Sequence, residues 1–340
     1  MNSDLNQESP WVVGIDAGGT RTRAVLADAR DGRAVGEGVA GPGNALTVPG
    51  PELVDHLAGA VASAVPEAGR ARVAAVVGGF AGAARAPEEE PGRVRARAAL
   101  TAALTRLGIG TGAVEVYSDI EAAFAGAPGQ PADGLALVAG TGVVAARIAG
   151  RVLVATSGGD GWLLGDDGGG FWIGREAARA ALRAADGRGG PTALTAAVGR
   201  ALGIPASALP PAEDALWRPE SRAAYRACLL PAVLDRPPVR LADLAPLVSR
   251  AAAEKDTVAA AVLRDAVAHL AATVAALGPR PGEALVVTGG LVAPDGPLLA
   301  PLTERLSPLD LTITPVPDGC AGAVALARLL ATGRRPAEAP

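Results

Sequence analysis

The same arrangement of short strands around a glycine turn occurs twice in this chain, at an offset of about 120 residues. The first copy predicts strands at 11–16, 21–28 and 33–39. The second copy begins near residue 134 and reads LALVAG, VVAARIAG and RVLVA. Each copy continues into helical and strand segments, so the chain is predicted to be an α/β protein of two similar βββαβα halves with a cleft between them.

The turn of the first copy lies in the stretch VVGIDAGGTRTRAVLAD, residues 12–28. A strand ends there in Asp16, and small or cationic residues follow it: Gly18, Gly19, Thr20 and Arg21. Such a hairpin turn exposes backbone N–H groups beside a carboxylate and a cation. It can therefore hold an anion next to a metal ion, which the handling of a nucleoside triphosphate requires. The alternative interpretation is an ordinary glycine-turned hairpin.

Two commoner glycine loops are excluded. A Walker loop needs a lysine after the glycines and leads into a helix, whereas the next segment here alternates like a strand and the chain's one lysine is Lys255. The segment GTGVVA at 140–145 matches a loose dinucleotide-binding pattern. However, the residues after it, RIAGRVLVA, indicate another strand pair, so we exclude dinucleotide binding at this segment.

Composition and charge restrict the class of protein. With 340 residues, 49% of them hydrophobic, the chain can form two domains with their own cores. A net charge of −4 offers no basic face for nucleic acid, and we see no apolar run of transmembrane length and no signal-like start, so no membrane partner is expected. Cys228 and Cys320 are isolated, which predicts no zinc site or iron–sulfur cluster held by this chain alone, and a reduced, cytoplasmic protein.

The remaining elements divide the chain into two domains. Those of the first half are expected at helix 51–65, strand 72–80, helix 92–107 and strand 113–118, which runs into Asp119. The second half is expected to continue with a glycine-dense loop at 157–170, helices between about 170 and 278, strands ALVVT and LTITP, and a helix at 320–331. The predicted boundaries are an N-terminal domain at 11–118 that the helix at 320–331 completes, a second domain at 119–319 with a helical insertion at about 170–278, and disordered tails at 1–10 and 332–340.

Five segments carry a resemblance to a known family: DAGGTRTR, YSDIEAAFAGA, VAGTGVVA, GGDGWLLGDDGGGFWIGREA and VVTGGL. Over about residues 11–331 the chain resembles the sugar-kinase/Hsp70/actin superfamily, and more narrowly the family of N-acetylglucosamine kinases and BadF/BadG-type ATPases. The resemblance implies two ribonuclease-H-like (actin/hexokinase-type) βββαβα domains around an interdomain cleft. It also implies ATP-dependent phosphorylation of an amino sugar with Mg²⁺, the best single acceptor being N-acetyl-D-glucosamine at its 6-hydroxyl.

The resemblance also implies roles for individual residues. The first phosphate loop would be Gly18, Gly19, Thr20 and Arg21, and the second would be Gly140, Thr141 and Gly142. The adenosine would lie against Gly289, Gly290 and Leu291. The sugar would contact Asn44, Asp119, Thr141, Gly159, Asp160 and Asp166. Asp16 would hold Mg²⁺ through water, and Asp119 would be the catalytic base, kept ionised by the start of the helix that follows it.

Several of these residues have a structural alternative. Asp119 could be a helix N-cap, Asp166 a turn residue in a glycine-rich loop, and Asn44 a turn former. Arg21 could be a cation on the strand surface. Trp162 is expected to pack rather than to face a sugar, because the segment after it is predicted to be helical.

One position departs from the family pattern. N-acetylglucosamine kinases typically read GGWG where this chain reads Gly159-Asp160-Gly161, so a carboxylate replaces an aromatic ring beside the sugar. A carboxylate can accept hydrogen bonds from an amine or pair with it. Free glucosamine or another hexosamine is therefore an alternative acceptor, whereas an anionic acceptor such as N-acetylmuramic acid is disfavoured.

Two functions of other classes compete with the kinase. Activator ATPases hold an iron–sulfur cluster between subunits through cysteines near the second phosphate loop, and no cysteine lies there in this sequence. A non-catalytic sugar sensor could use the same scaffold. The expected partners are ATP and a small amino sugar, and a homodimer is one option for the oligomeric state.

Overall fold

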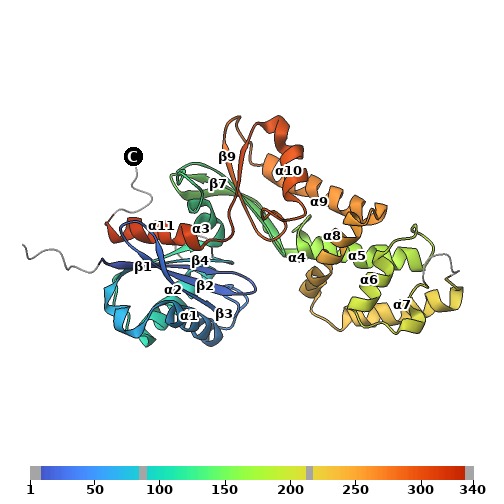
Figure 1. Cartoon of the computed structure of the whole chain (residues 1–340), viewed down its shortest axis with the longest axis horizontal. Helices are drawn as coiled ribbons and strands as arrows, with labels where there is room; N and C mark the ends of the chain where they lie inside the picture. The colour runs from blue at the N-terminus through green and yellow to red at the C-terminus, as the bar shows by residue number, and fades with distance from the viewer. Residues whose placement is uncertain (1–8, 84–89, 212–216, 334–340) are drawn as a thin grey trace, which may run out of the picture.

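The computed structural model describes residues 9–83, 90–211 and 217–333, and most of the two predicted tails (1–8 and 334–340) lies outside them. Figure 1 shows two β-sheets with flanking helices, and a group of helices at one end of the molecule. Ser9 and Pro10, which the sequence analysis assigns to the disordered tail, accept hydrogen bonds from the Arg72 side chain and from the backbone N–H of Ala29.

The two sheets repeat one topology. The first sheet has the order β3-β2-β1-β4-β5 and the second has the order β8-β7-β6-β9-β10 when read from its β8 edge. Strands of the first sheet are β1 (Trp11–Ala17), β2 (Thr22–Asp28), β3 (Ala34–Ala40), β4 (Val73–Phe80) and β5 (Ala113–Ser118). Strands of the second are β6 (Gly134–Ala139), β7 (Val143–Ala149), β8 (Val152–Gly158), β9 (Ala284–Thr288) and β10 (Thr312–Pro315). In each sheet three antiparallel strands precede two parallel ones, which confirms the predicted duplicated α/β fold.

Both faces of the first sheet are covered by helices. Along β2, Ala24 and Leu26 are buried on the face that packs against α1 (Gly50–Ala64) and α2 (Pro91–Arg106). Ala27 is buried on the opposite face, against α11 (Cys320–Ala331). Successive side chains of a strand point to opposite faces of the sheet. The alternation predicted for residues 21–28 therefore places side chains in the cores on both faces.

The chain crosses between the sheets twice, and a helix is exchanged at each crossing. Helix α3 (Asp119–Ala125) directly follows β5, yet Ile120 and Phe124 are buried in a cluster with residues of the second sheet such as Ala136 and Val286. Helix α11 follows β10, yet it packs on the first sheet. The two exchanged helices also contact each other.

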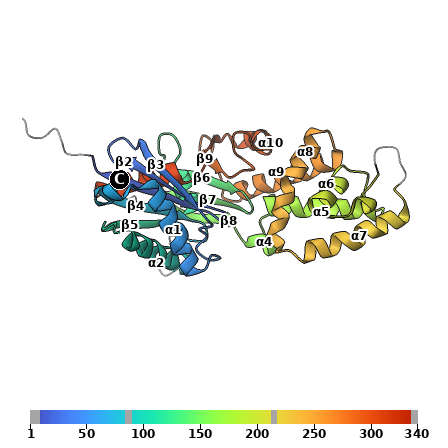
Figure 2. The same ribbon diagram turned by 60° about the horizontal axis from the view of Figure 1, so that its bottom comes forward.

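A helical insertion separates β8 from β9, at the place that α1 has in the first half. Its helices are α4 (Gly161–Leu164), α5 (Gly170–Ala185), α6 (Leu194–Ala201), α7 (Pro219–Leu234), α8 (Ala245–Ala253) and α9 (Thr257–Ala275). Helix α10 (Leu299–Leu306) lies between β9 and β10. Figures 1 and 2 both show α5, α6, α7 and α8 at the end of the molecule away from the first sheet. Strand β8 extends further than predicted, to Gly158, and the expected glycine loop contains the short helix α4.

Helix α9 corrects the expectation that no apolar run approaches transmembrane length. Its 19 residues, with a mean hydropathy of 1.5, are long and apolar enough to cross a membrane by length and composition. However, Val262, Leu270 and Val274 on this helix are buried in the core that contains the second sheet. Because the core helix of a folded domain passes the same test, α9 is weak evidence for a membrane span.

The contact between the exchanged helices gives a stability prediction. A Cβ at Gly322 of α11 would lie 1.8 Å from the carbonyl oxygen of Ala122 in α3, so Gly322→Ala is expected to destabilise the fold by about 2–3 kcal/mol. In an exposed helix the same change would be favourable, because alanine has the higher helix propensity. Urea unfolding of both proteins measures the difference.

Gly110→Ala is the matched control, since a Cβ at Gly110 would meet no atom within 4 Å. This control should leave the free energy of unfolding within about 0.5 kcal/mol of the wild type. Equal stability of Gly322→Ala and the wild type would show that α3 and α11 are not in close contact in solution.

Candidate functional site

The turn between β1 and β2 is anchored at its base and exposed at its tip. The backbone N–H of Gly18 donates to the carbonyl of Arg21 at 3.0 Å, and that of Gly43 donates to the carbonyl of Gly18 at 2.8 Å. Gly19, Thr20 and Arg21 are exposed. The predicted first phosphate loop is thus a fixed hairpin turn whose backbone is accessible to a ligand.

Asp16 precedes this turn and lies among charged groups. It pairs with Arg23 across the β1–β2 ladder and accepts a hydrogen bond from the backbone N–H of Gly319. Burial is the largest cause that raises the pKa of Asp16 to about 6, and the charges of Asp119 and Asp318 add to it. The Gly319 N–H and the Arg23 guanidinium lower this pKa by less. Asp16 is therefore a carboxylate that a cation would stabilise in its ionised form.

The groups around Asp16 fit a magnesium ion. Carboxylate oxygens of Asp16 and Asp318 and the sulfur of Cys320 all lie within 4.8 Å of one another. Mg²⁺ prefers oxygen ligands, so the two carboxylates suit it and the thiol does not. Burial raises the pKa of the Cys320 thiol, which keeps it protonated at neutral pH. Cys320 is far from Asp16 in the sequence but close to it in space.

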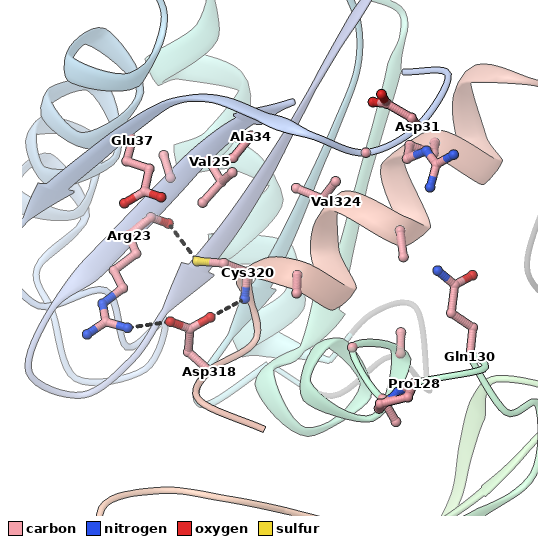
Figure 3. Close-up of a pocket in the computed structure, with 18 of the residues that line it drawn as sticks. Arg23, Val25, Asp31, Ala34, Glu37, Pro128, Gln130, Asp318, Cys320 and Val324 are labelled. Atoms are coloured by element: carbon pink, nitrogen blue, oxygen red, sulfur yellow. Dashed lines mark hydrogen bonds and ion pairs between the residues drawn. The ribbon is translucent and has the colours of Figure 1, made fainter. Parts of the chain in front are cut away.

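Arg23 and Asp318 are site residues that the sequence analysis missed. Figure 3 shows the Arg23 guanidinium paired with the carboxylate of Asp318, which also accepts a 2.9 Å hydrogen bond from the backbone N–H of Cys320. The pair lines a pocket of about 800 Å³ beside α11. The ion pair between Arg23 and Asp318 joins β2 to the segment that leads from the second sheet into α11. The two residues are 295 positions apart, so no local sequence signal could have revealed the contact.

Asp119 is the first residue of α3 and is not its N-cap. The cap is Ser118, whose hydroxyl accepts the N–H of Glu121 while the Glu121 carboxylate accepts the N–H of Ser118, so the N-cap interpretation of Asp119 is wrong. Asp119 is half-buried and accepts a 2.9 Å hydrogen bond from the N–H of Ile120. Burial is the dominant cause that raises its pKa, and it outweighs the backbone hydrogen bonds. The backbone hydrogen bond at the helix start lowers the pKa of Asp119, as expected, but burial opposes it and is the larger of the two effects.

Asn44 lies in the loop beside the first turn and does form a turn of its own. Its side-chain oxygen accepts the backbone N–H groups of Leu46 and Thr47 at 2.9 and 3.1 Å. This is the turn role that the sequence analysis kept as an alternative. The side-chain nitrogen is the group that remains for contact with a sugar.

The second glycine turn is packed against the start of α5. Gly140 donates to the carbonyl of Gly142 at 3.0 Å, which closes the turn. The N–H groups of Gly170 and Phe171 then donate to the carbonyls of Gly140 and Thr141 at 2.8 and 3.0 Å. Thr141 is exposed, so the turn presents this residue to a ligand while its backbone carbonyl is fixed by the helix.

Two further predicted regions meet at this second turn. Asp166, at a φ of 57°, accepts the backbone N–H of Val143 at 2.9 Å, and burial raises the pKa of Asp166. A Cβ at Gly289, which has a φ of 105°, would lie 2.3 Å from the carbonyl oxygen of Ala139. Only glycine allows this approach, so the proposed adenosine turn is held directly against the second phosphate loop.

The Asp160 segment is exposed and rich in left-handed glycines. Gly159 has a φ of 81°, and Asp160 precedes α4 at its N-terminal end. Trp162 is 39% exposed, with its ring centroid 5.4 Å from that of Phe171, so the expectation that Trp162 packs is only partly right. Leu163 is 73% exposed. This segment presents side chains to solvent rather than to the core.

The site residues therefore form two clusters on two sheets. The first consists of the first turn, Asp16, Asn44 and Asp119, and the second consists of the second turn, Asp160, Asp166 and Gly289 to Leu291. Among the described residues, no hydrogen bond or ion pair joins one cluster to the other. A ligand that contacted both would bring the two sheets together, as domain closure does.

Comparison with known proteins is consistent with this geometry. Residues 13–327 match the sequence profile of the BadF/BadG/BcrA/BcrD ATPase family, which agrees with the resemblance drawn from the motifs. None of the curated proteins matches the chain in sequence.

Solved structures share the fold over nearly the whole chain. A proposed N-acetylglucosamine kinase from Chromobacterium violaceum is 23% identical with a TM-score of 0.68, and 95% of this chain and 99% of that chain are covered. A proposed N-acetylglucosamine kinase from Porphyromonas gingivalis is 19% identical with a TM-score of 0.69, at coverages of 94% and 98%. A ROK family glucokinase from Streptomyces griseus, in complex with glucose and AMPPNP, is 21% identical with a TM-score of 0.54, at coverages of 94% and 99%. At these identities the likeness shows the fold, and it confirms the predicted two-domain class.

The charges around Asp16 give a pH-dependent stability prediction. Asp16→Asn is expected to stabilise the metal-free protein at pH 7.5 by about 1–3 kcal/mol, because the folded state raises this pKa from 3.8 to about 6. The folded wild type binds the Asp16 proton more tightly than the unfolded chain does. Its stability should therefore fall as the pH rises from about 4 to about 6, and the advantage of the variant should vanish near pH 4.

Urea unfolding in a chelating buffer at several pH values measures this effect. Asp55→Asn is the control, because its ion pair with Arg106 is largely exposed and should change stability by less than about 1 kcal/mol. If Asp16→Asn and the wild type were equally stable at pH 7.5, Asp16 would not be under electrostatic strain.

Proposed function

Because the chain belongs to the BadF/BadG/BcrA/BcrD ATPase family, we propose that it is an ATP-dependent kinase that phosphorylates an amino sugar. The best single acceptor is N-acetyl-D-glucosamine, and the product would be its 6-phosphate. The observation that carries this proposal is that Asp16 and Asp119 lie at the same edge of the first sheet, near the carboxyl ends of the parallel strands β1 and β5 that flank β4. One carboxylate could then accept a proton while the other holds a metal ion, as transfer of a phosphoryl group to an alcohol requires.

The nucleotide would bind between the two clusters. Backbone N–H groups of the first turn and the Arg21 guanidinium would contact the phosphate oxygens from one sheet. The turn at Gly140 to Gly142 would contact them from the other, with the adenosine against Gly289, Gly290 and Leu291. Asp16, with Asp318 beside it, would hold Mg²⁺, which when bound neutralises charge on the phosphate oxygens.

Asp119 would act as the general base. The sugar hydroxyl would lose its proton to the Asp119 carboxylate as its oxygen bonds to the γ-phosphorus, and ADP would leave. Burial raises the pKa of Asp119, which makes the carboxylate a better proton acceptor than an exposed aspartate. Alignment of base, hydroxyl and phosphate supplies most of the remaining rate, so both sheets need to close on the substrates.

Residues of the second sheet would make most of the contacts with the acceptor sugar. Asp166 would accept a hydrogen bond from a sugar hydroxyl, with Thr141 and Gly159 nearby and the Asn44 amide reaching from the first sheet. Asp160 is exposed and could accept hydrogen bonds from an amine. Glucosamine or another hexosamine is therefore the alternative acceptor.

The competing functions have less support. Cys228 lies on α7 and Cys320 on α11 beside Asp16, and neither belongs to the second phosphate loop, where an activator ATPase would hold its cluster. A non-catalytic sensor would not need the carboxylate at position 119. A cytoplasmic location is part of the proposal because ATP is the phosphate donor, and a homodimer stays a prediction.

Asp119→Asn tests the base directly. The variant should lower kcat by at least about 100-fold, because an amide cannot take the proton. Dissociation constants for ATP and sugar, measured by calorimetry, should change by less than about threefold, since the amide keeps the shape of the side chain. Asp243→Asn, at an exposed ion pair on the helical insertion, is the control and should leave kcat unchanged. Turnover at the wild-type rate by Asp119→Asn would mean that Asp119 is not the base.

Asp160→Trp tests the acceptor class. The wild type should phosphorylate N-acetylglucosamine or glucosamine within a panel of hexoses and hexosamines. The aromatic side chain should raise the ratio of kcat/KM for N-acetylglucosamine over glucosamine by about 10-fold, because an apolar contact replaces a partner for the amine. Asp167→Asn, at an exposed neighbour, is the matched control and should leave the ratio unchanged. Slow ATP hydrolysis without phosphorylation of any sugar would contradict the kinase proposal.

A further inference from the structure

Glu121 is a buried carboxylate that the proposed reaction does not use. It lies two residues after Asp119 in α3 and is 2% exposed. One of its oxygens accepts the backbone N–H of Ser118 at 3.0 Å and the Ser118 hydroxyl at 2.9 Å. The other oxygen accepts the backbone N–H of Leu153 in β8 at 3.0 Å. A capping box needs only the first of these interactions, so the contact with β8 requires a further explanation.

The contact with Leu153 joins the base to the second sheet. Strand β8 is at the edge of that sheet and pairs with β7 alone. An edge strand leaves a row of N–H groups without a neighbouring strand, and the Glu121 carboxylate takes one of them. The same side chain holds Ser118, the residue before Asp119. Glu121 therefore connects the backbone at Asp119 to the strand that leads to Gly159 and Asp160.

Asp119 needs such a connection because it lies where the chain leaves the first sheet. Residue 118 ends β5, whereas Ile120 and Phe124 are buried against the second sheet. When the two sheets close, the base could follow either one. A displacement of about 1 Å at a reacting group can cost about 100-fold in rate, so its position relative to the acceptor pocket matters.

We propose that Glu121 is a positioning residue that fixes Asp119 to the second sheet, and so keeps the base in register with the acceptor residues of that sheet. This inference rests on the proposed role of Asp119 as the base. Glu121 acts through the backbone of Ser118 and Asp119 and does not touch the substrates. We therefore expect the Glu121 carboxylate to be needed for the rate of phosphoryl transfer and not for binding of ATP or sugar.

Glu121→Gln is the first test. The amide has one acceptor oxygen, so it cannot accept from both Ser118 and Leu153, and one contact becomes an N–H facing an N–H. We expect kcat to fall by at least about 10-fold while KM for ATP and for sugar stays within about threefold of the wild type. Glu115→Gln is the matched control, because Glu115 lies on β5 and pairs only at the surface, with Arg97 at 2.8 Å. An equal fall in kcat in Glu121→Gln and Glu115→Gln would overturn the proposal, and so would a rise in KM with an unchanged kcat.

A double-mutant cycle separates positioning from a general structural role. In the Asp119→Asn background, Glu121→Gln should reduce the residual turnover by less than about twofold, because there is no base left to position. A structural role would reduce turnover by the same factor in both backgrounds, and that result would overturn the proposal.

Leu153→Pro tests the same contact from the other partner, and it covers the case in which Glu121→Gln fails to fold. Proline removes the N–H that Glu121 accepts, and an edge strand tolerates proline where, as at Leu153, the N–H is bonded outside the neighbouring strand. The variant should show the same fall in kcat, and the capping box should remain. Wild-type kcat in Leu153→Pro would overturn the proposal.

Hydrogen exchange distinguishes this inference from the proposed function. The Leu153 N–H should exchange at least about 10-fold faster in Glu121→Gln than in the wild type, without any substrate present. Unchanged exchange would overturn the contact even if the protein is a kinase. If exchange is faster in Glu121→Gln but the wild type phosphorylates no sugar, the contact between Glu121 and Leu153 is supported and the proposed kinase function is contradicted.

Discussion

The exchange of α3 and α11 between the two sheets is the constraint on which the rest of the structure depends. Helix α11 follows a strand of the second sheet and packs on the first, whereas α3 follows a strand of the first sheet and contacts both sheets. Gly322 allows the two helices to touch at Ala122. The two covalent links between the halves are therefore also packed elements of both cores. Neither helix can leave its core without exposing apolar surface, so the helix pair holds the two sheets together.

The same two crossings carry the groups that the proposed chemistry needs. Asp119 begins α3, and Asp318 and Gly319 directly precede α11 and contact Arg23 and Asp16. The helix pair and the proposed reacting centre are thus one region of the chain. The cost is the burial of charge, since desolvation first, and then the charges of Asp119 and Asp318, raise the pKa of Asp16. A folded protein that retains such a cluster gives up stability at a place where function requires charge.

The backbone features of this molecule could be predicted from the sequence, and its long-range side-chain contacts could not. Strand alternation and the glycine turns predicted both sheets, because a hairpin needs only local residues. The contact of Arg23 with Asp318 and that of Glu121 with Leu153 join residues that are 295 and 32 positions apart. Such pairs depend on how the helices are exchanged, which no spacing in the sequence encodes. For the same reason the proximity of Cys320 to Asp16 was missed.

This difference also explains why the phosphate end of the site is easier to recognise than the acceptor end. Backbone N–H groups are the expected phosphate ligands, and such turns restrict positions to glycine, as at Gly142 and Gly289, where a Cβ would lie 2.7 Å from the Asp166 carboxylate and 2.3 Å from the Ala139 carbonyl oxygen. The proposed sugar contacts at Asp160 are side chains on an exposed segment, where a substitution disturbs no core packing. The fold therefore restricts the donor chemistry strongly and the acceptor weakly. Within one scaffold, the acceptor can change by substitutions in the segment before α4 while Asp16, Asp119 and the two turns stay in place.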